Sequence, residues 1–246
     1  MGEADMSSIT STVKSVSEYL EWTRDSKRKT VHVLYRGQRK PWKMLPSISR
    51  IGMPSALLEH EKTLLECFKR EAARCLHKVP DNDWDWLVVA QHHGLPTRLL
   101  DWTSDPKVAL WFALEKTQVI PDSEPVVWQL CPDAKDYVTN QASGRPFHGK
   151  RTKLFETTFD IPRVRAQQGY FSLSKHSTKW KSGFVALEEN RYLKDMLTGV
   201  RVSLKYASSM LSELESEGYT RNKIYPPRVD AIAKMVKNHV IKGLVQ

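Results

Sequence analysis

The segment that most constrains the fold is DPKVALWFAL, residues 105–114. Asp105 followed by Pro106 predicts the start of a helix, because an Asp side chain caps free backbone amides and Pro suits the first helical position. The residues from Val108 to Leu114 are apolar on every side of this helix. We therefore expect the helix to run through the core of a folded domain rather than along its surface.

Apolar periodicity elsewhere predicts an alternation of helices and extended segments. The expected elements are a helix over residues 11–24, a strand over 31–35, a helix over 55–77, a helix over 83–92 and an extended segment over 97–103. The 246 residues contain no repeat and no low-complexity linker. The expected fold class is α+β, with a mixed or antiparallel sheet flanked by helices in a single domain over residues 1–246.

Two of these helices carry further signals at an end or on one face. Gly94 is expected to close helix 83–92 in the left-handed conformation, and Ser55 is a candidate N-cap of helix 55–77. The apolar face of helix 55–77 is expected to carry Leu58, Leu65, Phe68, Ala72 and Cys75. This stripe predicts that the helix packs against the core.

The three cysteines predict no disulfide. Cys67 and Cys75 lie on one predicted helix, which separates their backbones by roughly 12 Å and points the side chains in different directions. Cys131 has no obvious partner. Together with an N-terminus that lacks an apolar signal segment and a chain that lacks a membrane-length apolar run, reduced thiols predict a cytoplasmic protein with no membrane contact.

The net charge of +10, from 38 basic and 28 acidic residues, favours a polyanionic partner. Basic residues recur at 23–30, 36–43, 148–153 and 174–182, and two of these segments contain a tryptophan. Lysines in such segments contact phosphates and tryptophans stack on bases. The candidate nucleic-acid contacts are Lys40, Trp42, Lys43, Lys179 and Trp180. The alternative is a solvated basic surface without one continuous patch.

A polar cluster precedes the core helix in QHHGLPTRLLDWTSDP, residues 91–106. In one interpretation Arg98 and Asp101 form a buried ion pair that braces the turn, and His92 or His93 caps backbone carbonyl groups. In the other, the same groups line a pocket whose ligand supplies their missing partners. Which histidine faces inward is open at this point, because neighbouring residues on one element point in different directions.

A second string, LYRGQ at residues 34–38, ends the expected strand with an aromatic residue, an arginine and a glycine. Glycine allows close approach to the backbone, so Arg36 is expected to project toward an anionic ligand with the bare backbone of Gly37 beside it. We expect Arg36, one of the two histidines and Arg98 to converge on one cleft.

The sequence resembles the FRG domain family, which is named for its (Phe/Tyr)-Arg-Gly motif. The resemblance rests on YRGQ at 35–38, Trp42, LPSISR at 45–50, AQHHGLPTRLLDWTSDPKVALWFAL at 90–114, RVRAQQGYFSLS at 163–174 and KIYPPRVDAIAKMV at 223–236. The last of these looks like the closing strand-to-helix segment of that family. The resemblance covers residues 12–240.

The YRG string is also similar, more weakly, to the first motif of arginine-type ADP-ribosyltransferases, in which Tyr-Arg-Gly at a strand end contacts the NAD donor. This similarity implies an ADP-ribosyltransferase-like fold that uses NAD. No metal ion is expected, because the sequence has no CxxC, no HExxH and no zinc-deaminase pattern. The implied NAD contacts are Tyr35, Arg36, Gly37, Gln91, Thr97, Arg98 and Thr103. The implied catalytic residues are Arg36, His92, His93, Asp101 and Gln168.

The sequence departs from this pattern at one position. Gln167 and Gln168 fall where those enzymes place a catalytic glutamate, and a glutamine supplies a dipole instead of a charge. Either Asp101, Glu188 or Glu189 supplies the charge, or the fold has kept a nucleotide-binding pocket and lost the reaction.

Three functions follow from these features. The resemblance implies an NAD-using toxin or phage-defence effector that modifies nucleic acid or protein, with an antitoxin or another defence protein as a partner. A non-catalytic module that binds nucleic acid or a nucleotide is the alternative. The third is a hydrolase that uses His92 or His93 with Asp101, although the sequence lacks the carboxylate cluster of a two-metal site.

Overall fold

The computed structural model describes residues 6–25, 32–51, 56–117, 122–142, 144–149 and 151–226. The strands are β1 (Ile9–Val13), β2 (Leu34–Gln38), β3 (Leu99–Thr103), β4 (Val126–Leu130), β5 (Lys153–Phe155), β6 (Gly169–Leu173) and β7 (Leu197–Val202). The helices are α1 (Val16–Arg24), α2 (Leu57–Ala72), α3 (Asp83–His92), α4 (Pro106–Leu114), α5 (Pro162–Ala166), α6 (Ala207–Ser216) and α7 (Arg221–Ile224). Among the short 3₁₀ turns, η2 (Ser47–Arg50) and η5 (Leu187–Glu189) bear on the site.

All seven strands belong to one mixed sheet in the order β1-β7-β4-β2-β3-β6-β5. The outer strand β1 runs parallel to β7, and the other neighbouring strands pair antiparallel. The predicted class, α+β with a mixed sheet flanked by helices, is confirmed.

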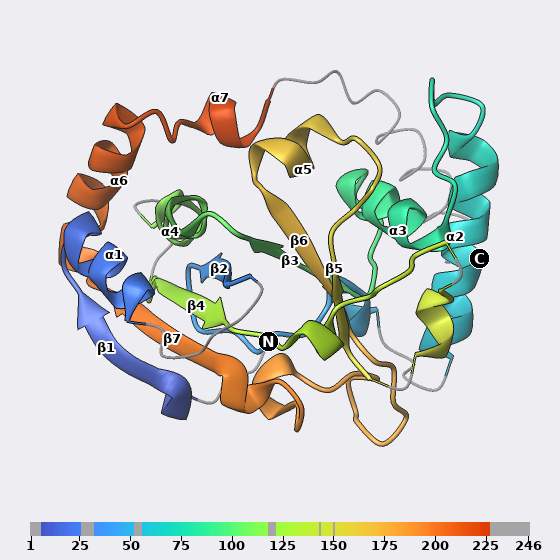
Figure 1. Ribbon diagram of the computed structural model, residues 1–246, viewed down its shortest axis with the longest axis horizontal. Helices are drawn as coiled ribbons and strands as arrows, with labels where there is room; N and C mark the ends of the chain where they lie inside the picture. The colour runs from blue at the N-terminus through green and yellow to red at the C-terminus, as the bar shows by residue number, and fades with distance from the viewer. Residues whose placement is uncertain are drawn as a thin grey trace.

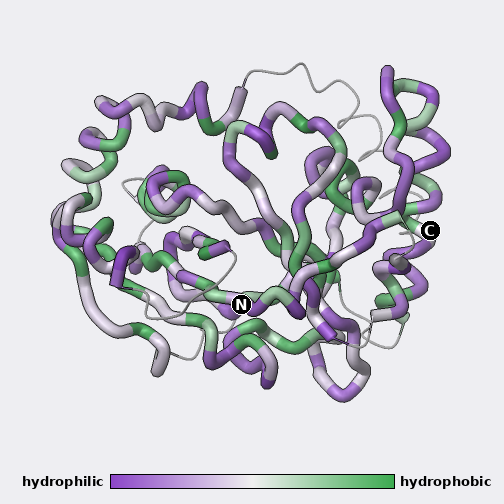
Figure 2. Tube along the Cα trace, viewed as in Figure 1, coloured by the Kyte–Doolittle hydropathy of each residue, from purple (hydrophilic) through white to green (hydrophobic). Residues whose placement is uncertain are grey.

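Helices cover one face of the sheet in two groups (Figure 1). Helices α1, α4 and α6 pack with side chains of β2, β4 and β7, whereas α2 and α3 pack with side chains of β3, β5 and β6. The opposite face holds a third apolar cluster, which includes Trp102 and Trp128 and is covered by Met44, Leu187 and Leu193 from irregular segments. Figure 2 shows the hydrophobic positions gathered along the central strands and on α4.

The elements around the core helix form as the sequence predicts. Helix α3 spans the predicted residues, and Gly94 follows it with φ of 87°. Asp105 caps α4 by accepting hydrogen bonds from Lys107 N and Val108 N, and Pro106 is the first helical residue. Most side chains of α4 are buried, so this helix runs through the interior.

The first two predicted elements have wrong boundaries. Residues 11–13 belong to β1, because Ser15 caps α1 at Glu18 N and starts that helix only at Val16. The strand predicted over 31–35 is displaced to β2, which continues through the whole LYRGQ string.

The helix predicted over 55–77 is shorter, since α2 spans Leu57–Ala72. Leu65, Phe68 and Ala72 are buried as predicted, whereas Leu58 is only partly buried. Cys75 lies beyond the helix end and is exposed. The buried face instead includes Glu61, which lies among apolar side chains.

The three cysteines are free thiols, as predicted. No helix in the described part of the chain is long and apolar enough to cross a membrane. The candidate N-cap Ser55 and most of the segment predicted as a closing strand and helix, residues 227–236, lie outside the described residues. The part of that segment that is described ends helix α7 and begins no strand.

Candidate functional site

Strands β2 and β3 separate almost as soon as they meet. They share one registered pair, Tyr35 with Thr103, whereas β2 with β4 and β3 with β6 share five pairs each. Beyond that pair, Arg36 Nη1 donates a hydrogen bond of 2.6 Å to the backbone carbonyl oxygen of Asp101. A side chain therefore bridges the two strands beyond their registered pair, and the sheet opens into a cleft.

Gly37 has a second role besides the predicted one. A Cβ atom at this position would overlap the carbonyl oxygen of Ala109 and lie 2.7 Å from the amide nitrogen of Ala113. Both atoms belong to α4. The glycine therefore lets the core helix approach β2, and it also lines the cavity beside Arg36.

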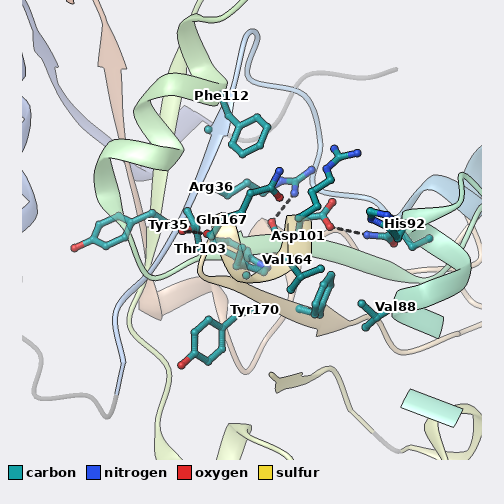
Figure 3. Close-up of a pocket in the computed structure, with 16 residues that line it drawn as sticks. Tyr35, Arg36, Val88, His92, Asp101, Thr103, Phe112, Val164, Gln167 and Tyr170 are labelled. Carbon is teal, nitrogen blue, oxygen red and sulfur yellow. Dashed lines mark hydrogen bonds between the residues drawn. The ribbon is translucent and has the colours of Figure 1, made fainter. Parts of the chain in front are cut away.

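A cavity of about 270 Å³ lies at this opening. Figure 3 shows Arg36 and Asp101 at its centre, with Phe112 on one side, Val164 and Tyr170 on another, and His92 beyond Asp101. Other lining residues come from β2, β3, α3, α5 and β6: Tyr35, Gly37, Val88, Gln91, Trp102, Thr103, Arg163, Gln167, Gly169 and Phe171. The two helix groups leave this space between them on the helix-covered face of the sheet.

The carboxylate of Asp101 is held by Gln91, and Gln91 is held in turn by Thr97. Gln91 Nε2 donates to Asp101 Oδ1 at 2.7 Å, and Thr97 Oγ1 donates to Gln91 Oε1 at 2.5 Å. Because Thr97 fixes which end of the Gln91 amide points at Asp101, the three residues form one relay. The carboxylate is exposed to the cavity in a defined orientation.

The guanidinium of Arg36 is poorly solvated. Burial lowers the pKa of Arg36 below its ordinary value, the nearby Asp101 carboxylate opposes this shift, and the positive charge of Arg50 adds to it. Its Nε is buried and makes no hydrogen bond to any residue that the structure describes. A buried donor without a partner costs about 1–3 kcal/mol. Nε itself is covered by protein, so an anion in the cavity would be stabilised by the positive charge of the guanidinium.

The outer wall of the cavity depends on the segment that follows α6. Arg163 lies over the ring of Tyr225 at 4.5 Å, and Phe112 packs edge-on against the same ring at 5.9 Å. Gln167 Nε2 donates to the carbonyl oxygen of Ile224 at 2.9 Å. Sequence reasoning missed Arg163, Phe112 and Tyr225 as site residues, and the one available signal was that all three lie inside strings that resemble the family.

Residues 31–120 match the family model of the FRG domain. The chain carries an FRG domain. The match includes Arg36, Gln91 and Asp101, and ends before α5 and the Tyr225 segment that complete the cavity. Neither the search of curated proteins nor the search of solved structures gives a significant match.

The predicted ion pair between Arg98 and Asp101 in the FRG domain is wrong. Arg98 pairs with Glu61 of α2, whose Oε2 lies 2.5 Å from both Nε and Nη2 of the guanidinium. Glu61 Oε1 also accepts a hydrogen bond from the backbone amide of Arg98. Arg98 is 2 % exposed and does not line the cavity, because its guanidinium is held at Glu61 of α2. The predicted cleft therefore gathers Arg36 and His92 but not Arg98.

The two histidines take different positions. His92, the last residue of α3, lines the cavity beside Asp101. His93 is 6 % exposed and packs against the ring of Phe68 in the α2–α3 cluster. The question left open by the sequence is thus answered: His92 is the histidine that faces the cleft.

The remaining candidates are distributed around the cleft. Thr103 lines the cavity and donates to the carbonyl oxygen of Gln167, whereas Thr97 acts one layer behind, through Gln91. Gln168 is exposed with φ of 45° and contacts Ser104 and Asp105 outside the cavity. A left-handed backbone at Gln168 turns its side chain away and leaves Gln167 in the wall.

The other two candidate acids lie elsewhere. Glu188 accepts hydrogen bonds from Met44 N, and Glu189 forms an ion pair of 2.6 Å with Lys43. Both belong to η5, which covers the opposite face of the sheet near Met44. Asp101 is therefore the one acidic side chain among the residues that line the cavity.

The candidate nucleic-acid residues lie on two separate segments. Trp42 is partly buried under Arg39, and Lys43 is paired with Glu189. Trp180 is 39 % exposed and lies with Lys179 on the loop closed by the His176–Phe184 bridge. Lys40, which follows β2, is partly buried. Within the described ranges no cluster of three or more His, Cys, Asp or Glu side chains is arranged to hold a metal ion.

Proposed function

We propose that the cleft binds NAD and that the FRG-domain protein transfers ADP-ribose to an acceptor on nucleic acid or protein. The observation that carries this proposal is the pairing, in one cavity, of a poorly solvated arginine with an oriented carboxylate, Arg36 and Asp101. An arginine with a buried, unpartnered Nε favours a phosphate. A fixed carboxylate favours a reaction in which positive charge develops on the ligand.

The chain supplies each part of that reaction from its own residues. Arg36 binds a phosphate of the donor, and Asp101 stabilises the positive charge on the anomeric carbon while the bond to nicotinamide breaks. Nicotinamide leaves with the electron pair of that bond. The acceptor's nucleophile then bonds to the same carbon, and His92 takes the proton that the nucleophile loses.

A role as a toxin or phage-defence effector belongs to the same proposal. An enzyme that consumes NAD without control depletes the cell that makes it of that cofactor. An antitoxin or defence-system partner that blocks the cleft is therefore the kind of partner that this activity requires.

The test is release of nicotinamide from NAD in the presence of candidate acceptors, with the modified acceptor identified by mass spectrometry. Asp101→Asn keeps an oxygen that can accept from Gln91 and removes the charge, so we expect the rate to fall about 10²-fold or more. Gln168→Glu adds a charge outside the cavity and is expected to leave the rate unchanged. A rate that rises in Gln168→Glu and is unaffected in Asp101→Asn would assign the reaction to the segment between α5 and β6, which carries Gln168.

A non-catalytic nucleotide-binding module is favoured by one observation. The amide of Gln167 is already bound to the Ile224 carbonyl and Gln168 faces outward, so the α5–β6 segment brings no acid into the cavity. If NAD binds and no acceptor yields nicotinamide, this second function replaces the first.

A further inference from the structure

A second hollow adjoins the cavity on the other side of Arg36. It is an open groove of about 470 Å³, and it shares Arg36, Gln91 and Asp101 with the cavity. We call these three residues the shared wall. A ligand larger than the cavity can therefore extend across the shared wall into the groove.

Two strings of the FRG domain build the groove, and neither contributes the reactive groups proposed above. The LPSISR string supplies Leu45, Ser47 and Arg50, and the GLPT string supplies Gly94, Leu95 and Pro96. The two strings are joined at Thr97, whose carbonyl oxygen accepts from Ile48 N and whose amide donates to Ser47 Oγ. Since Ile48 is fully buried, the short turn η2 is anchored and places Arg50 at the edge of the groove.

The charges around the groove favour an anion. Arg36 and Arg50 both line it, and Asp101 is the one acidic residue among its lining residues. The side chain of Arg50 is exposed and lines the same groove as Arg36, and its positive charge contributes to the lowered pKa of Arg36. A pair of neighbouring arginines suits two linked phosphates better than a single one.

The remaining surface of the groove is open and mostly polar. Leu45, Leu95 and Pro96 provide a smaller apolar part, which suits the mixed polar and apolar character of a nucleoside. At Gly94 a Cβ atom would meet no other atom within 4 Å, so the space above this glycine is free for a ligand. Such a surface accommodates the ring of a nucleoside whose phosphate lies on the arginines.

We propose that the groove binds the second nucleoside of a dinucleotide, with the diphosphate crossing the shared wall between Arg36 and Arg50. The FRG domain then selects a dinucleotide over a mononucleotide, and Arg50 is the residue that reads the second phosphate. This inference rests on the proposed binding of NAD and adds to it the place of the second nucleoside and the residue that contacts the second phosphate.

The test is calorimetric titration of the full chain with ADP-ribose, which has a diphosphate, and with nicotinamide mononucleotide, which has one phosphate. Arg50→Ala is expected to weaken ADP-ribose about tenfold or more, because a charge-assisted contact is lost, and to change nicotinamide mononucleotide by less than about twofold. Arg50→Lys keeps the charge and loses the forked geometry, so its loss is expected to be intermediate. Arg74→Ala removes an equally exposed arginine at the end of the α2 region, paired with Glu71, and is the charge-matched control.

Each result decides the matter. Selective loss of ADP-ribose in Arg50→Ala supports the proposal. Equal weakening of both ligands, no weakening of either, or wild-type binding of ADP-ribose that is no tighter than that of nicotinamide mononucleotide overturns it. If neither compound binds but a single-stranded oligonucleotide does, and Arg50→Ala abolishes that binding, the groove belongs to nucleic acid. Nicotinamide release, measured separately, shows whether the proposed reaction stands when the groove inference fails.

Discussion

Two arginines of the FRG domain have opposite surroundings: Arg98, directly before β3, and Arg36, within β2. Arg98 is fully buried, has both carboxylate oxygens of Glu61 within hydrogen-bond distance, and lies over the rings of Phe147 and Phe184. Arg36 has one hydrogen bond, to a backbone carbonyl, and a buried Nε that no described residue satisfies. The guanidinium of Arg98 is therefore paired with a carboxylate of the fold. The guanidinium of Arg36 has no ion pair among the described residues and is the group that we propose binds a ligand.

This difference predicts that Arg98 serves the stability of the FRG domain and that Arg36 serves the proposed ligand. A buried arginine with a dedicated acid is destabilising to break, because the remaining charge is stranded. Arg36 gains one hydrogen bond between the strands and leaves one buried donor unpaired, so we expect its net contribution to the stability of the fold to be small. Each of the following changes tests one side of the comparison.

The largest effect is expected at Glu61. Glu61→Gln leaves the buried Arg98 charge without its partner, and we expect the free energy of unfolding to fall by about 3–5 kcal/mol. Urea denaturation measures it. The matched control is Glu59→Gln on the same helix, where the side chain is 72 % exposed and the change is expected to stay within about 0.5 kcal/mol. Equal effects at the two positions would mean that Arg98 is not braced by Glu61.

The next largest effect is expected at Gly37, which neighbours Arg36 but serves the core helix. Gly37→Ala drives a methyl group into the backbone of α4, and we expect destabilisation of about 1–3 kcal/mol, or more if the helix cannot shift. Gly149→Ala is the control, because its nearest neighbour, the carbonyl oxygen of Arg151, lies at 3.6 Å. An unchanged thermal midpoint in Gly37→Ala would show that α4 does not approach β2 this closely.

A smaller effect is expected at Tyr225, on the outer wall of the cavity. Tyr225→Leu removes the ring that holds Arg163 and Phe112, and we expect a loss of about 1 kcal/mol in stability together with several-fold weaker nucleotide binding. Tyr225→Phe keeps the ring and loses only a hydrogen bond of 3.4 Å to Glu115, so it is expected to bind as the wild type does. If both variants bind equally weakly, the hydroxyl group and not the ring supports the wall.

The smallest effect concerns a buried carboxyl group that, unlike Glu61, is held mainly by backbone amides. Burial raises the pKa of Glu188 above its ordinary value of 4.5. A raised pKa means that the folded protein disfavours the charged form of this carboxyl group. The contribution of Glu188 to the free energy of unfolding is therefore lost as the pH rises through its folded-state pKa. Relative to Glu188→Gln, the wild type should lose stability between pH 4.5 and neutrality, by less than about 1 kcal/mol. If the wild type instead gained stability relative to Glu188→Gln over that pH range, the pKa of Glu188 would be lowered and not raised in the folded protein.

The parts of the fold that the sequence predicts well are set by local signals. Gly94 and the Asp105–Pro106 pair fix the ends of α3 and the start of α4 through caps within a few residues. The partner of Arg98 lies 37 residues away, so the nearer Asp101 was chosen instead. A better signal was available, since Glu61 falls on the apolar face of the predicted helix, where an acid needs a buried partner.

The cavity shows the same limit. Arg36, His92 and Asp101 were predicted because they stand in recognisable strings, and the structure brings them together. The wall made by Arg163 and Tyr225 depends on how α5 and α7 pack, which no local pattern encodes. The outward turn of Gln168 depends on a single left-handed backbone angle. Tertiary packing, and not propensity, therefore decides which members of the motif face the cleft.

The central claim is that Arg36 serves a ligand and not the fold. Thermal unfolding of the wild type and of Arg36→Ala, each with and without NAD, tests it most directly. We expect Arg36→Ala to unfold within about 2 °C of the wild type when no nucleotide is present, and NAD to raise the midpoint of the wild type only. A variant that melts as early as Glu61→Gln, or one that keeps the full NAD-dependent rise, would contradict the account.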